Sequence, residues 1–160
     1  MSLHKFALAW ATTALVAATP KTIVEAPTTA GADVELAEIV LGFDASTPGN
    51  VRIELGTFTT TGTGTAIAQA NIVIVSSSDR SVTSSITAAK VSDTVEPTGF
   101  TVNAGGNAVW PGLLMPLPCY FPFQTPLYEG ITLPHSTNFA IRLTASINCN
   151  TMGWVSYKEL

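Results

Sequence analysis

The sequence predicts an all-β protein, an antiparallel β-sandwich or a barrel that forms a single domain over residues 1–160. Apolar and polar residues alternate with a period of two in several short segments, which is typical of half-buried strands. Thr, Val and Ile, which suit a pleated surface, are frequent throughout the chain. Turn-forming residues separate the segments, and many short strands joined by turns indicate a sandwich or a barrel.

The N-terminal segment comes first and resembles a secretory signal. Lys5 precedes an apolar run that ends in small residues near Ala18. Trp10 and two threonines interrupt this run, so we expect ordered structure here, with residues 1–11 forming an N-terminal arm. A membrane-spanning helix needs roughly 18 uninterrupted apolar residues. The chain has no such run, and we expect no membrane partner.

Alternation marks the expected strands along the rest of the chain. The segment 34–43 changes phase, which fits a strand with a bulge near Ala37; a short helix is the alternative. Other alternating segments are predicted strands and cover residues 51–55, 82–88, 127–133, 139–146 and 152–157. Turn signals separate these segments and lie at 46–50, 61–65, 105–107 and 134–138.

One stretch, WPGLLMPLPCYFPFQTPLYEGITLP at 110–134, is too rich in proline for a helix and too apolar to lie bare in water. Because proline cannot donate to a sheet ladder, we expect 110–126 to form an extended loop outside the sandwich. A contact with another protein surface would then bury its large apolar side chains, namely Trp110, Leu113, Leu114, Met115, Tyr120, Phe121 and Phe123. The alternative is a loop folded back over its own core.

The low charge of the chain points to a partner. Charged residues make up 11 % of the sequence and hydrophobic residues 46 %, whereas soluble domains usually carry about 25 % charged residues. We therefore expect a homo-oligomer or another protein partner rather than a monomer coated in hydroxyls. The net charge is −4, and Arg52, Arg80, Lys90 and Arg142 are scattered. A grip on nucleic acid needs clustered cations, so we expect no nucleic-acid partner.

The sequence offers no recognisable catalytic, cofactor or metal site. His4 and His135 have no second ligand at metal-binding spacing, and TGTGTA lacks the remaining residues of a nucleotide loop. Asp44 and Ser46 offer oxygen ligands, but a calcium loop needs more carboxylates. No acid–base pair can be named from spacing because the carboxylates are isolated, namely Glu25, Glu35, Glu38, Glu54, Asp79 and Asp93. We expect a protein that is not an enzyme, with no cofactor and no metal.

Four motifs follow one another in a distinctive order: FTTTGTGTAIAQ at 58–69, VEPTGF at 95–100, ITLPHSTNFAIRLTAS at 131–146 and a final GWVSYKEL. Their order resembles small virion proteins of tailed bacteriophages, of the decoration or cement type, over most of the chain. The resemblance implies a jelly-roll-like sandwich on the outer capsid surface, commonly a trimer, with the major capsid protein as partner. The chain departs from the pattern of these proteins in two places. It ends in Lys158-Glu159-Leu160 where paired acids are expected, and its Pro-rich stretch at 110–126 is longer and more apolar.

The resemblance also bears on the two cysteines. Cys119 and Cys149 are too few for a disulfide framework, so two buried thiols are favoured and a single bridge is the alternative. Phage assembly in the host cytoplasm, a reducing compartment, implies that the thiols are reduced. A different class of function also stays open, a carbohydrate-binding jelly-roll module. It would present coplanar, exposed aromatic rings chosen from Trp110, Tyr120 and Trp154.

Overall fold

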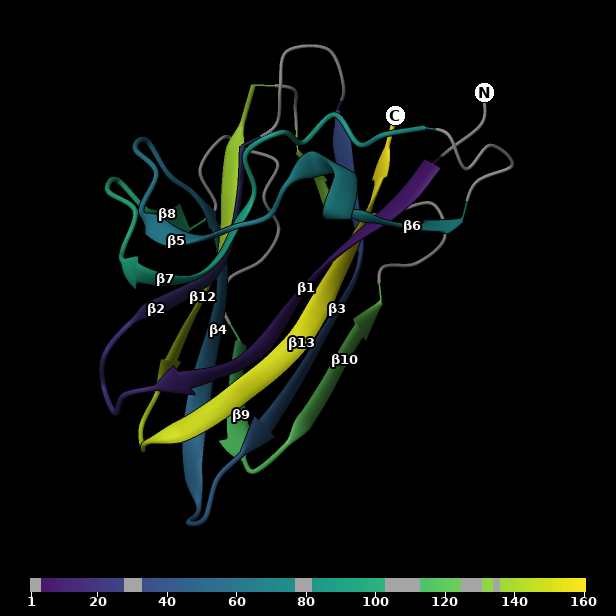
Figure 1. Cartoon of the computed structure of the whole chain (residues 1–160). Helices are drawn as coiled ribbons and strands as arrows, with labels where there is room; N and C mark the ends of the chain where they lie inside the picture. Colours follow the sequence, from purple (N-terminus) through teal and green to yellow (C-terminus); the bar gives the residue numbers. More distant parts are fainter. Residues whose placement is uncertain (1–3, 28–32, 77–81, 103–112, 125–130, 134–135) are drawn as a thin grey trace.

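The fold is a sandwich of two antiparallel β-sheets (Figure 1). The computed structural model describes residues 4–27, 33–76, 82–102, 113–124, 131–133 and 136–160. These residues contain no α-helix and one short 3₁₀ helix, η1 (Gln69–Asn71). The all-β sandwich predicted from the alternating segments is confirmed.

The first sheet, called sheet A here, has the strand order β10-β3-β13-β1-β6, and β11 pairs with the beginning of β3. Long antiparallel ladders join β13 to β1 on one side and to β3 on the other. The strands of sheet A are β1 (His4–Leu15), β3 (Val34–Asp44), β6 (Val73–Ser76), β10 (Tyr120–Gln124), β11 (Ile131–Leu133) and β13 (Cys149–Glu159).

The second sheet, sheet B, has the order β5-β7-β2-β12-β4-β8, and β9 pairs with the first half of β4. Its strands are β2 (Lys21–Pro27), β4 (Gly49–Thr57), β5 (Thr63–Ala66), β7 (Lys90–Val95), β8 (Thr101–Val102), β9 (Leu113–Leu117) and β12 (Asn138–Ala145). The inner faces of the two sheets meet in one hydrophobic core. The alternating side chains of β12 belong to this core, and they are Phe139, Ile141, Leu143 and Ala145.

The segment 34–43 is a strand and not a helix. The register between β13 and β3 shifts where Ser156 lies opposite Glu38 and Tyr157 lies opposite Leu36. Ala37 is therefore the extra residue, and the bulge predicted near it is confirmed. The bulge returns the apolar residues on both sides of Ala37 to the core face.

Two predicted strands differ from the structure. Residues 82–88 form no strand, although Ser84 and Ile86 are buried. Ser84 is held by side-chain hydrogen bonds with Tyr157 and Glu159 at the end of β13 instead of by a ladder. Of the predicted strand 127–133, only β11 lies within the described residues, because 127–130 fall outside them.

The expectation of an N-terminal arm over residues 1–11 is wrong for its described part. From His4 opposite Glu159 to Leu15 opposite Cys149, β1 pairs with β13, and its other edge pairs with β6. Phe6 and Leu8 are fully buried in the core. The apolar run that resembles a secretory signal is therefore an inner strand of sheet A.

The expectation of a loop over residues 110–126 is also wrong for its described part. β9 pairs with β4 and β10 pairs with β3, so the segment supplies an outer strand to each sheet (Figure 1). Pro116 lies opposite Asn50, and Pro122 lies opposite Val40. Proline is tolerated at such positions because an edge strand needs ladder hydrogen bonds on one side alone.

Candidate interaction surface

Burial alternates residue by residue along β9 and β10. One row packs on the core and contains Leu113, Met115, Leu117, Cys119, Phe121 and Phe123. The other row is exposed and contains Leu114, Pro116, Pro118, Tyr120, Pro122 and Gln124. The apolar stretch that the sequence analysis singled out is thus half covered by the protein's own core and half open to solvent.

This alternation divides the residues expected at an interface. Phe121 is 7 % exposed and stacks on Phe123, with 6.3 Å between the ring centroids. An interface role is therefore wrong for Phe121, and Leu113, Met115 and Phe123 are also directed to the core. Leu114 and Tyr120 are the two large members of the set that remain exposed, at 64 % and 66 %. Trp110 lies outside the described residues.

Tyr120 belongs to a wider apolar surface on the outside of sheet A. Cross-strand register places Tyr120 beside Gly42 and Gly42 beside Met152. The next row runs from Pro122 through Val40 and Trp154 to Ala9. Val73 and Val75 of β6 extend the surface and are 59 % and 48 % exposed. We call this set the apolar face, and it consists of Ala9, Gly42, Val73, Val75, Tyr120, Pro122, Met152 and Trp154, while Val40 is buried between its neighbours.

The apolar face has a charged border that is neutral overall. Lys158 Nζ lies 2.9 Å from Glu35 Oε1, and Lys5 Nζ lies 3.7 Å from Glu38 Oε2. Gln124 Nε2 also donates a hydrogen bond to Glu38 Oε1 at 3.0 Å. Because these charges are paired within the sheet, the border favours neither a positively nor a negatively charged partner. Desolvation of the apolar atoms would dominate binding here.

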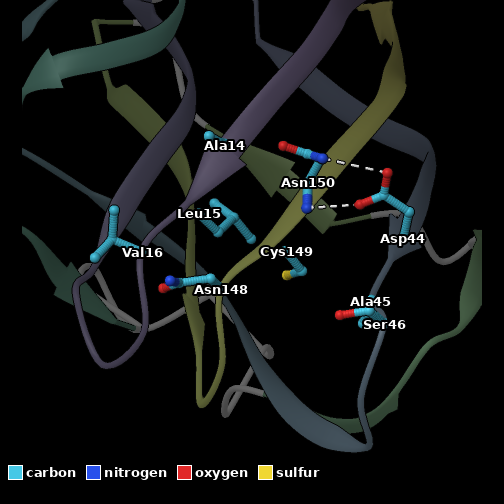
Figure 2. A pocket seen from close by; sticks show the side chains of 9 residues that line it. All are labelled: Ala14, Leu15, Val16, Asp44, Ala45, Ser46, Asn148, Cys149 and Asn150. Carbon is cyan, nitrogen blue, oxygen red and sulfur yellow. Dashed lines mark hydrogen bonds between the residues drawn. The ribbon is translucent and has the colours of Figure 1, made fainter.

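A cavity of about 670 Å³ lies at one end of the sandwich and contains Asp44 and Ser46, the weak calcium-loop candidates (Figure 2). Both carboxylate oxygens of Asp44 accept hydrogen bonds from Asn150, at 2.8 and 3.2 Å. Asn148 Oδ1 accepts a hydrogen bond from the backbone N–H of Ala17 at 2.9 Å. These polar groups are committed to joining the ends of the strands. Among the described residues, no group of three or more His, Cys, Asp and Glu could hold a metal ion.

Sequence spacing missed one cluster of acidic residues. Glu25 on β2 and Asp93 on β7 looked isolated, but the structure brings their carboxyl groups together. Glu25 is fully buried, and Asp93 is 2 % exposed. The one signal in the sequence was the TGTGT turn, whose Gly62 and Gly64 lie directly on these carboxyl groups. Neither Glu25 nor Asp93 lines any of the three cavities found among the described residues.

Both cysteines are free thiols near the cavity end of the sandwich. Burial raises the pKa of Cys119, and burial followed by the charge of Asp44 raises the pKa of Cys149. In the described part of the chain, no helix has the length and apolar character needed to cross a membrane. Comparison with known protein families, with characterised proteins and with solved structures found no match.

Proposed function

We propose that the protein is a structural virion protein that decorates a bacteriophage capsid. It binds the outer surface of the major capsid protein, stabilises the shell and acts as a homotrimer without catalysis. The observation that carries this proposal is the apolar face. Contiguous exposed apolar patches are rare on monomeric proteins and mark contacts with other proteins. The low charge of the chain, 11 % of residues, supports the same conclusion.

We also propose that the sandwich is a jelly roll. Eight strands support this topology, with the order β1-β13-β3-β10 in sheet A and β2-β12-β4-β9 in sheet B. Strands from opposite ends of the chain are neighbours in each sheet, while β1 and β2, β3 and β4, β9 and β10, and β12 and β13 lie in different sheets. A folded-over ribbon of strands has this order. Jelly rolls occur in viral capsid and lectin domains.

Tyr120 is the expected anchor of the contact. An aromatic side chain buries roughly 150–250 Å², and apolar burial contributes about 25 cal/mol per Å². Because Tyr120 is 66 % exposed, its burial against a partner would contribute on the order of 3 kcal/mol. Met152 lies two strands away across Gly42 and is 54 % exposed. The two side chains together would account for about a 100-fold or larger effect on affinity.

The test combines light scattering with sedimentation on purified shells that lack their decoration protein. We expect a trimer mass and co-sedimentation of the wild-type protein. The double variant Tyr120→Ser, Met152→Ser should keep its fold and lose binding by about 100-fold. Val95→Ser is the matched control, since Val95 is 60 % exposed but lies on β7 of sheet B. A monomer that fails to bind shells, or a control that binds as poorly as the double variant, would contradict the proposal.

One observation favours the carbohydrate-binding alternative. Tyr120 and Trp154 lie on the same face with β3 between their strands and are offset by two residues along the strands, which places their backbones about 12 Å apart. Trp154 is partly buried beside Val40, so it offers less of its ring than a sugar platform would. Sedimentation with insoluble polysaccharides separates the two functions. Retention that is lost in Tyr120→Ser, without binding to shells, would favour the sugar-binding module.

A further inference from the structure

Two segments of the chain, FTTTGTGT at 58–65 and VEPTGF at 95–100, lie together at the β5–β7 edge of sheet B, where residues 63–65 belong to β5 and Val95 belongs to β7. Thr60 and Thr98 form an isolated β-bridge, and the backbone N–H of Thr59 donates to Thr98 O at 3.0 Å. The Thr94 hydroxyl donates to Thr63 O at 3.1 Å. The two segments therefore form one covering layer, and the Glu25–Asp93 pair lies beneath it.

The carboxyl pair lacks the hydrogen bonds that two ionised groups would need. Glu25 Oε1 accepts a hydrogen bond from the backbone N–H of Gly62. Glu25 Oε2 and both oxygens of Asp93 are buried, and no described residue donates a hydrogen bond to them. Two unpaired buried carboxylates in contact would be strongly unfavourable. One shared proton removes the conflict, because a protonated Asp93 donates to the carboxylate of Glu25.

The neighbouring charges support this arrangement. Lys90 Nζ lies 3.8 Å from Glu25 Oε2 and donates to Gly62 O at 2.6 Å, so it compensates one negative charge. Glu96 accepts hydrogen bonds from the backbone N–H and the hydroxyl of Thr22, at 2.7 and 2.5 Å. Burial, then Glu25 and Glu96, raise the pKa of Asp93 to about 8, while Lys90 acts in the opposite direction.

The turn over residues 61–65 closes directly on the pair. A Cβ atom at Gly62 would lie 2.7 Å from both Asp93 Oδ2 and Glu25 Oε1, and one at Gly64 would collide with Asp93 Oδ1. Glycine is thus required at both positions because a side chain there would prevent the backbone of the turn from contacting the two carboxyl groups. Residues 63–65 of the turn belong to β5, the edge strand of sheet B, which pairs with β7 on one side, whereas β2 and β7 have partner strands on both edges. The turn is therefore the part that can move away when water must reach the pair.

We propose that Glu25 and Asp93 form a proton-dependent latch that holds the turn 61–65 on sheet B. With the proton in place, Glu25 accepts the Gly62 N–H and the turn is closed. Loss of the proton puts a second negative charge beside Glu25, and among the described residues Lys90 is the one cation that faces the pair. The turn then detaches and admits water. The latch couples the covering layer at the β5–β7 edge to alkaline pH and does not depend on the proposed capsid function.

The test is an NMR titration of the isotope-labelled protein from about pH 5 to about pH 10. We expect the side-chain carboxyl carbon of Asp93 to titrate near pH 8, and the amide signals of Gly62 and Gly64 to shift with the same midpoint. Asp93→Asn should remove these amide shifts, because an asparagine N–H still donates to Glu25 and cannot ionise. Asp44→Asn, which removes a carboxylate elsewhere, should leave them unchanged.

A second variant keeps the test decisive if Asp93→Asn does not fold. Glu96→Gln removes a charge that raises the pKa of Asp93, so the shared midpoint should move to lower pH. An Asp93 carboxyl that titrates near its ordinary value of about 4, or glycine amides that do not follow it, would overturn the proposal. Millimolar calcium that shifts the same amides at neutral pH would also overturn it, because the pair would then hold a divalent cation in place of the proton.

Discussion

Truncation of two neighbouring residues on β10, Tyr120 and Phe121, should change the folding free energy by very different amounts. Phe121 points to the core and is 7 % exposed, whereas Tyr120 points outward and is 66 % exposed. Phe121→Ala removes a buried ring and leaves a cavity, which costs about 3–5 kcal/mol of folding free energy. Part of that loss comes from the stack on Phe123, since aromatic pairs contribute about 0.5–1.5 kcal/mol beyond area burial. Tyr120→Ala should change subunit stability by at most about 0.5 kcal/mol.

Urea denaturation of both variants, followed by circular dichroism at several protein concentrations, measures this difference. The concentration series separates folding of the subunit from association, because association makes the midpoint depend on concentration. A typical domain is stable by about 5–15 kcal/mol, so Phe121→Ala should unfold at a much lower urea concentration. Equal and small effects of the two variants would refute the inward and outward assignment of β10. A larger loss for Tyr120→Ala would refute it as well.

Three further predictions follow from buried groups. The native state keeps a proton on Asp93 that the unfolded state releases near pH 3.8, so the unfolding free energy should fall as pH rises from there to about 8. The unfolding free energy should fall by at most about 1.4 kcal/mol per pH unit. Urea denaturation of Asp93→Asn at several pH values should show no such decrease. Gly64→Ala should destabilise the fold, measured as a lower thermal midpoint, because its Cβ collides with Asp93; an unchanged midpoint would count against the contact. Cys119 and Cys149 should react with iodoacetamide in unfolded, unreduced protein, and a mass spectrum without two added groups would indicate a disulfide.

The sequence by itself determined the strands whose two faces differ in burial. Residues 51–55 and 139–146 showed a period of two, and both lie in strands with one face in the core, β4 and β12, except that Ser146 follows the end of β12. The bulge at Ala37 was also readable, because an extra residue reverses the phase of the apolar row. Such signals are local, since each side chain of a half-buried strand records its own face.

Only the tertiary structure decided where prolines and isolated acids lie. Apolar side chains alternate between core and solvent from Leu113 to Phe123, but the prolines in this segment suggested a loop. Pairing with β4 and β3 makes the segment two edge strands, β9 and β10, in which proline is tolerated. Glu25 and Asp93 are far apart in the sequence and meet because β2 pairs with β7. Sequence spacing does not encode such pairings, because ladder register and the closure of the TGTGT turn are set by contacts between distant segments.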